Sequence, residues 1–200
     1  MRLMVYLMGA TLFCVSCASH LTNSAADKQM ETSRVPAQAD EKVLSIITAA
    51  EMRTKLKRYC EDEDSNGVCY MTFALAEEYC AAQGSRLFSA REFAEIAVSR
   101  GARRITGTKP ETSYSTEIST KNADGTTEKF YLDHAGAAYQ RPSQEPGDLC
   151  VWSSSRHSIQ SNRVYSFNNN TGLFSLRNAV QFSSNPAPSL CAATCVNTHP

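Results

Sequence analysis

The 200-residue sequence has no excess of charge of either sign, because 20 Lys and Arg residues balance 20 Asp and Glu residues. A neutral chain without a basic stripe gives no indication of a nucleic-acid partner. After its first 15 residues the chain also lacks an apolar run long enough to cross a bilayer. The Gly-x-Ser-x-Gly elbow of many serine hydrolases is absent as well. These absences argue against a nucleic-acid-binding protein, a multi-spanning membrane protein and a common class of hydrolase.

The first 17 residues have the pattern of an export signal. Arg2 precedes a mostly apolar run, 3–15, which is too short to span a bilayer comfortably. The segment Cys14-Val15-Ser16-Cys17 resembles the lipobox of bacterial lipoproteins, in which the last cysteine receives the lipid. The resemblance implies lipidation of Cys17, membrane contact through that anchor only, and an outer-membrane location. The alternative is cleavage after Ala18, which would give a periplasmic or secreted protein.

Six cysteines lie beyond this leader, and an even number in an exported chain predicts disulfides, because the envelope is oxidising. They are Cys60, Cys69, Cys80, Cys150, Cys191 and Cys195. Spacing alone does not choose among their pairings. A zinc site is the alternative, but these six contain no C-x-x-C and have no histidine at ligand spacing. The sequence therefore predicts disulfides, no metal centre and no cofactor.

The composition divides the chain into a leader, a linker and one domain. Residues 18–41 are polar and small, which predicts a flexible tether because such a segment buries too little surface to order itself. Apolar residues at helical spacing over 42–58 predict an amphipathic helix that flanks the domain. The domain itself is expected to cover 59–200.

The segment from Cys60 to Cys69 has the features of a hairpin. Its acidic run ends in Asn66-Gly67, a turn pair, and a disulfide between its two cysteines would staple it. A calcium loop is the alternative, but the run lacks the ligand spacing and terminal glutamate of an EF-hand.

Two helices follow, and then a strand-rich half. The first is expected over 73–83, ending at Gly84, and the second begins at the capping box Ser89–Glu92 and continues to residue 99. The polar stretch 106–127 indicates a long loop or a weak hairpin. Strands are predicted at 129–132, 150–154, 163–167, 173–176 and 190–196, so the fold class is α+β.

Several of these motifs together resemble the C-type-lectin-like superfamily. The first are Cys69-Tyr70, Ala76-Glu-Glu-Tyr-Cys80, Gly84-Ser-Arg-Leu87 and Ser89…Glu92-Phe93. Later ones are Val151-Trp-Ser-Ser-Ser155, Val164-Tyr-Ser-Phe-Asn168, Gly172 and Cys195-Val196. The second group is similar to the bacterial branch that includes the formylglycine-generating enzymes.

The resemblance implies a disulfide-stapled domain with two short helices and a strand-rich second half. It also implies the pairs Cys60–Cys69, Cys80–Cys195 and Cys150–Cys191. Glu145-Pro-Gly-Asp148 echoes the calcium loop of sugar-binding lectins, but glycine replaces the amide ligand and no Trp-Asn-Asp strand is present. Calcium binding is therefore not expected. The copper chemistry of the formylglycine-generating enzymes is not expected either, because it needs cysteine thiols.

The sequence thus favours a binding module that engages a protein or glycan, with no catalytic residue assigned. Trp152, Arg156 and His157 are the candidate ligand-binding residues, because an aromatic ring with polar neighbours suits a binding surface. Placement of Trp152 in the core is the alternative. A serine hydrolase using the serines of 153–155 with His157 or His134 lacks the expected motif. The alternative functions are an enzyme derived from the formylglycine-generating branch and a structural envelope protein.

Overall fold

The computed structural model describes residues 43–111, 115–121, 125–134, 139–179 and 189–198. The expected leader (1–17), lipidation at Cys17 and tether (18–41) lie outside these ranges. The described residues form three helices, α1 (Ala49–Lys55), α2 (Phe73–Ala82) and α3 (Ala90–Ser99). Their ten strands are β1 (Asp62–Glu63), β2 (Cys69–Tyr70), β3 (Ser85–Leu87), β4 (Arg103–Ile105), β5 (Ser115–Lys121), β6 (Thr127–Asp133), β7 (Cys150–Arg156), β8 (Arg163–Asn168), β9 (Phe174–Asn178) and β10 (Cys195–Asn197).

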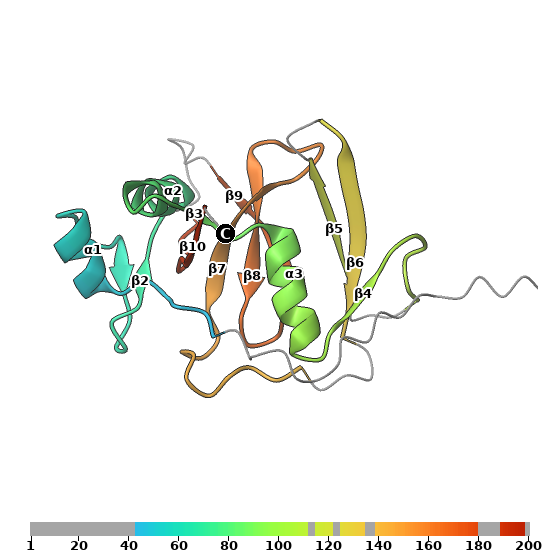
Figure 1. Ribbon diagram of the computed structural model, residues 1–200, viewed down its shortest axis with the longest axis horizontal. Coiled ribbons are helices and arrows are strands. Elements are labelled where there is room, and N and C mark those ends of the chain that lie inside the picture. Colours follow the sequence, from blue (N-terminus) through green and yellow to red (C-terminus); the bar gives the residue numbers. More distant parts are fainter. Residues whose placement is uncertain (1–42, 112–114, 122–124, 135–138, 180–188, 199–200) are drawn as a thin grey trace, which may run out of the picture.

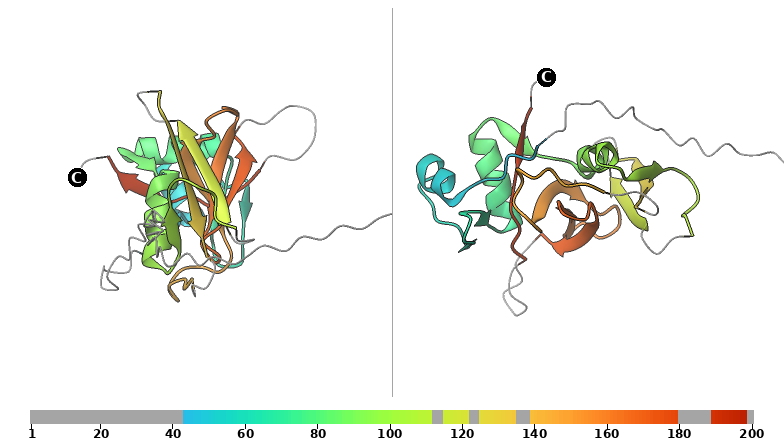
Figure 2. Two further views of the ribbon diagram at one scale, coloured as in Figure 1. Left: turned by 90° about the vertical axis from the view of Figure 1, so that its right-hand side faces the viewer. Right: turned by 90° about the horizontal axis from the view of Figure 1, so that it is seen from below.

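These elements make an α+β fold with four small antiparallel sheets, ordered β1-β2, β10-β3, β4-β6-β5 and β7-β8-β9. The β7-β8-β9 sheet lies in the middle of the molecule, with α1 and α2 at one end and the β4-β6-β5 sheet at the other (Figures 1 and 2). The predicted fold class is confirmed at this level.

The central sheet separates two hydrophobic cores, because successive side chains of a strand point to opposite faces. Val151 of β7 and Tyr165 of β8 pack in one core with Phe93 of α3. Their neighbours Trp152 and Val164 pack in the other core, with the residues of α1 and α2. Neighbouring side chains of β8 therefore contribute to different cores.

The two three-stranded sheets meet where the end of β5 approaches the end of β7. Thr120 of β5 forms an isolated β-bridge with His157, just after β7. The Tyr165 hydroxyl accepts from the Ser119 N–H at 2.8 Å, and the Ser158 N–H donates to the Ser119 carbonyl at 2.9 Å. The end of β5 is thereby fixed against the end of β7.

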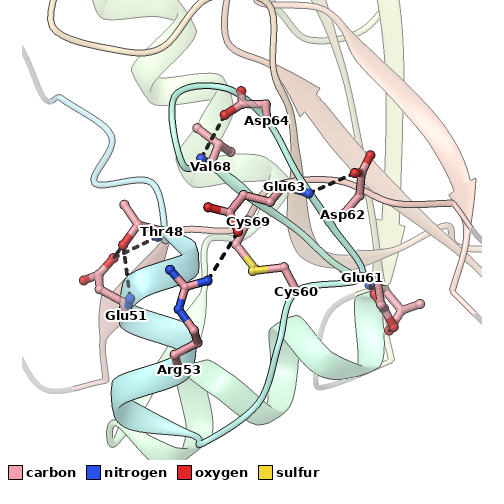
Figure 3. The surroundings of a disulfide bond; sticks show 11 residues. Thr48, Glu51, Arg53, Cys60, Glu61, Asp62, Glu63, Asp64, Val68 and Cys69 are labelled. Carbon is pink, nitrogen blue, oxygen red and sulfur yellow. Dashed lines mark hydrogen bonds and ion pairs between the residues drawn. A yellow bond between two sulfur atoms is a disulfide. The ribbon is translucent and has the colours of Figure 1, made fainter.

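The flanking helix is shorter than the predicted 42–58. Thr48 has extended backbone and starts α1 through a capping box with Glu51 (Figure 3). The preceding residue, Ile47, is also extended, because its backbone bonds Ala193 and Cys69. Tertiary hydrogen bonds thus replace helical ones before residue 49, and the apolar spacing there reflects burial rather than a helix.

The predicted acidic hairpin is present. Asp64 accepts from the N–H groups of Asn66 and Val68, and Gly67 closes the turn with a φ of +75°. Figure 3 shows the Cys60–Cys69 disulfide joining the two sides of this hairpin next to α1.

The two internal helices confirm their sequence signals. α2 ends at Gln83, followed by Gly84 at φ +66°, a conformation that favours glycine. Ser89 and Glu92 form the expected capping box at the start of α3.

In the second half one prediction becomes definite and another needs correction. The stretch 106–127, predicted as a long loop or a weak hairpin, contains β5, which pairs antiparallel with β6 from Ser115 to Lys121, as the hairpin alternative requires. The strand predicted over 190–196 is divided: Cys191 and Ala192 form single bridges with Met71 and Val151, and β10 begins only at Cys195. The strand is interrupted because successive parts of this segment pair with different strands or residues: Cys191 with Met71, Ala192 with Val151, and Cys195 with Leu87.

All three implied disulfides are present: Cys60–Cys69, Cys80–Cys195 and Cys150–Cys191. The long one links α2 to β10, which pairs with β3 through the register Cys195↔Leu87. The two ends of the domain are therefore held together covalently and by a strand pair.

Loss of the long disulfide should cost more stability than loss of the short one. The two bridges have sequence separations of 115 and 9, for which chain entropy gives about 5 and about 3 kcal/mol. Cys80→Ala/Cys195→Ala should therefore lower the free energy of unfolding more than Cys60→Ala/Cys69→Ala, as measured by urea denaturation. Peptide mapping without reduction should recover the three pairs. Recovery of Cys80 joined to Cys69 would contradict this topology.

Lowering the pH should destabilise the start of α3, because Glu92 becomes protonated. Burial acts to raise the pKa of Glu92, but hydrogen bonds from Arg86 and Ser89 outweigh it and lower this pKa to about 2. An unfolded glutamate titrates near about 4.3, so the stabilisation is present above that pH and is lost as the pH falls towards about 2. Glu92→Gln should flatten the dependence of unfolding free energy on pH in this window. Glu95→Gln, on the exposed side of α3, is the control, and an equal flattening there would refute the assignment.

Candidate functional site

A polar cleft of about 670 Å³ lies where the N-terminal end of α3, the end of β5, the start of β6 and the end of β7 meet. Its hydroxyl-bearing residues are Ser89, Thr120, Ser154, Ser155, Ser158 and Ser161. Its charged or titratable residues are Arg91, Lys121, Glu128, Arg156 and His157. The ends of these strands gather near the top of the molecule in Figure 1. We call this feature the polar cleft.

A β-bulge in β7 shapes one wall of the polar cleft. Trp152 pairs with Ser166 and Arg156 with Val164, so four residue steps on β7 oppose two on β8. The extra residues turn towards α3: the Ser154 N–H donates to the Phe88 carbonyl, and the Ser155 hydroxyl accepts from the Ala90 N–H. Bulges of this kind re-aim side chains beside functional sites.

The hydroxyls of the polar cleft fall into two groups. Those of Ser89 and Ser155 are engaged with backbone at the start of α3, and the Ser158 hydroxyl bonds Ser119. Within the described residues, the hydroxyls of the other three form no side-chain hydrogen bond: Thr120, Ser154 and Ser161. Thr120 is notable because its side chain sits in a residue only 7% exposed. The Thr120 hydroxyl itself is not among the buried side-chain atoms that lack a partner, so it is open to the cleft and available to a ligand.

Positive charge predominates in the polar cleft. The carboxylate of Glu128 already accepts from Arg104, at 2.6 Å. Arg91 reaches Glu95 and Glu128 only at 3.6 and 3.9 Å. Lys121 has no ion-pair partner among the described residues. Among the described residues, the lining therefore contains one lysine without an ion pair, Lys121, and one arginine, Arg91, whose two carboxylate contacts are long.

Arg156 and His157, two of the predicted ligand-binding residues, both line the polar cleft. Nη1 of Arg156 donates to the Ser161 carbonyl at 3.1 Å, and its guanidinium lies 5.1 Å from the centre of the Phe73 ring. Nδ1 of His157 accepts from the N–H groups of Ile159 and Gln160. In the neutral ring the proton is therefore on Nε2, which remains a donor.

Trp152, the third predicted residue, is a correction. It is 0% exposed, its Nε1 donates to the Met71 carbonyl at 2.7 Å, and its ring packs edge-on against Phe73. The side chain is a core residue and does not form part of a surface. The bulge that follows it separates its environment from that of Arg156.

The segment Glu145–Asp148 is structural. The Glu145 carboxylate is buried, pairs with Arg100, and accepts from the Leu44 N–H at 2.6 Å. Asp148 accepts from Asn168 at 2.9 Å. Because the Glu145 oxygens are already occupied by donors, they do not fit a calcium ion.

The copper chemistry of the formylglycine-generating branch does not fit either. Each of the six cysteines in the described residues is in a disulfide, which leaves no thiolate there to bind the metal. Those residues also contain no group of three His, Cys, Asp or Glu side chains placed to hold a metal ion.

A serine hydrolase site is not assembled. His157 uses Nδ1 for backbone N–H groups, and the Asp133 carboxylate lies 2.5 Å from Arg103. Burial lowers the pKa of His134. No described hydrogen bond joins a serine hydroxyl to either histidine, so the base of a triad is missing.

The residues that sequence reasoning missed are Arg91, Thr120 and Lys121. Residues 115–121 were expected in a loop or weak hairpin because of their polarity. The usable signal was β-branching at every second position, Thr116, Ile118 and Thr120, which is typical of a strand. Nothing in the sequence indicated that this strand would end beside His157.

None of the helices in the described ranges has the length and apolar content to cross a membrane. Comparison of the chain with protein-family models, curated proteins and solved structures finds no match.

Proposed function

We propose that the chain is a binding module with a calcium-independent, lectin-like fold, and that its protein or glycan ligand occupies the polar cleft. The module is a cell-envelope lipoprotein anchored at Cys17, or a secreted protein. The observation that carries the proposal is the polar cleft itself, with its unbonded hydroxyls and its excess of cationic over anionic side chains.

Three further observations support binding rather than catalysis. The disulfides are compatible with an oxidising compartment outside the cytoplasm. The side chains of the polar cleft are held by backbone contacts, as the bonds of Arg156 and His157 show, which favours preorganised recognition. The histidine, serine and carboxylate side chains described above are not arranged as nucleophile, base and orienting group.

Calcium should have no effect on the fold. Because Arg100 and Leu44 occupy the Glu145 carboxylate, the segment Glu145–Asp148 offers no calcium site through which the ion could stabilise the native state by mass action. The melting temperature, measured by circular dichroism, should be the same in excess EDTA and in millimolar calcium chloride. A rise of several degrees on adding calcium would contradict the assignment of this carboxylate to a structural ion pair.

Blocking the polar cleft should abolish ligand binding. The test uses fluorescently labelled full-length protein on an array of neutral and acidic glycans together with immobilised envelope proteins. Ser161 is exposed and lines the cleft, so Ser161→Trp should fill it without disturbing the core. We expect binding to at least one class of probe, and at least about a tenfold loss in this variant.

The matched control is Ser65→Trp, because Ser65 is also exposed but lies in the Cys60–Cys69 hairpin, outside the cleft. It should bind as the wild type does. Binding that survives Ser161→Trp, or a wild type that binds no probe, would overturn the proposed function.

A further inference from the structure

We propose that the polar cleft selects acidic saccharides, whose carboxylate or sulfate groups meet Lys121, Arg91 and Arg156 while their hydroxyls meet Thr120, Ser154 and Ser161. The inference rests on the proposed function and specifies its ligand class.

The negative charge expected of the ligand follows from the cationic side chains that line the polar cleft. Lys121, at the end of β5, has no ion-pair partner in the described part of the chain, and Arg91 on α3 is more than half exposed with two long contacts. The one carboxylate of the lining, Glu128, is already paired with Arg104. A ligand that brought negative charge would therefore give Lys121 an ion pair and would lie beside the exposed guanidinium of Arg91.

The unbonded hydroxyls of the polar cleft favour a saccharide over an acidic peptide as the ligand. A serine or threonine hydroxyl both donates and accepts, and so does each saccharide hydroxyl, whereas a peptide carboxylate only accepts. The three unbonded hydroxyls stand on three different segments: β5, the bulge of β7 and the turn after it. His157 adds an N–H donor from Nε2. This mixture of donors and acceptors around a few cations matches a polyhydroxylated anion.

The cleft also lacks the anchors that protein partners use. No large apolar or aromatic side chain is among its lining residues, and Ile159, which is exposed in the turn between Ser158 and Ser161, is not one of them. Protein interfaces concentrate their binding energy in such side chains. A protein epitope is therefore a poorer match than a sugar.

The test measures binding of the full-length protein to four immobilised polymers by biolayer interferometry. Oligogalacturonate carries carboxylates, dextran sulfate carries sulfates, dextran is the neutral saccharide, and polyglutamate is the acidic peptide. We expect binding to one or both acidic saccharides at least about tenfold tighter than to dextran or polyglutamate, and weaker in high salt, because exposed charges are screened.

Charge variants identify the site. Lys121→Glu should weaken binding of the acidic saccharide about tenfold, whereas Lys121→Arg should retain it, because the arginine keeps the charge. Lys109→Glu makes the same change at an exposed position outside the cleft and should behave as the wild type.

The outcomes separate this inference from the proposed function. Tighter binding of dextran or polyglutamate, lost in Ser161→Trp, would overturn the acidic-saccharide inference and leave a binding cleft in place. Equal losses in Lys121→Glu and Lys109→Glu would show that overall charge rather than the cleft is responsible, and would also overturn it. Absence of binding to all four polymers would overturn it too, and if the array and the immobilised proteins were negative as well, the proposed function would fail with it.

Discussion

The buried ion pair between Arg100 and Glu145 is the interaction around which the rest of the domain is arranged. Arg100 lies just after α3, and Glu145 lies in the segment before β7. The same carboxylate accepts from Leu44, and Arg100 also donates to the Tyr139 hydroxyl, which in turn donates to the Asn169 carbonyl. Removing one partner of such a pair leaves a buried charge and costs about 3–5 kcal/mol. This hydrogen-bond network thus links the first described segment, through Leu44, with α3, through Arg100, and with the central sheet, through Asn169.

This pair lies at the C-terminal end of α3, and the polar cleft lies at its N-terminal end. One helix therefore connects the most rigid polar cluster of the domain with its candidate binding surface. The capping box of Ser89 and Glu92, with Arg86 bonded to Glu92, fixes the N-terminal end. A binding surface built on such anchored elements needs little reorganisation to accept a ligand, which favours affinity.

The position of Glu145 changes what the lectin resemblance implies. In the calcium loop of sugar-binding lectins, which Glu145–Asp148 resembles, a carboxylate faces the ion, whereas the Glu145 carboxylate faces Arg100 inside the protein. The acidic side chain that resembles a ligand serves stability instead. Candidate binding chemistry is found at the other end of α3, where cations and hydroxyls from β5 and β7 meet. A motif of four residues therefore gave the right local turn and no guide to the site.

Local signals in the sequence determined the elements whose hydrogen bonds are local: the Asn66–Gly67 turn, the capping box at Ser89 and the end of α2 at Gly84. The same kind of reading failed at 43–48, where backbone hydrogen bonds to distant strands replace helical ones. At 106–127 it left a loop and a weak hairpin open, and the pairing of β5 with β6 decided for the hairpin. Arg156 and His157 could be selected from their residue types, but Trp152 could not be distinguished from them by sequence. The tertiary structure alone decided that, because Trp152 pairs in register with Ser166 and packs in the core, whereas the two-residue bulge after it turns the next residues towards α3.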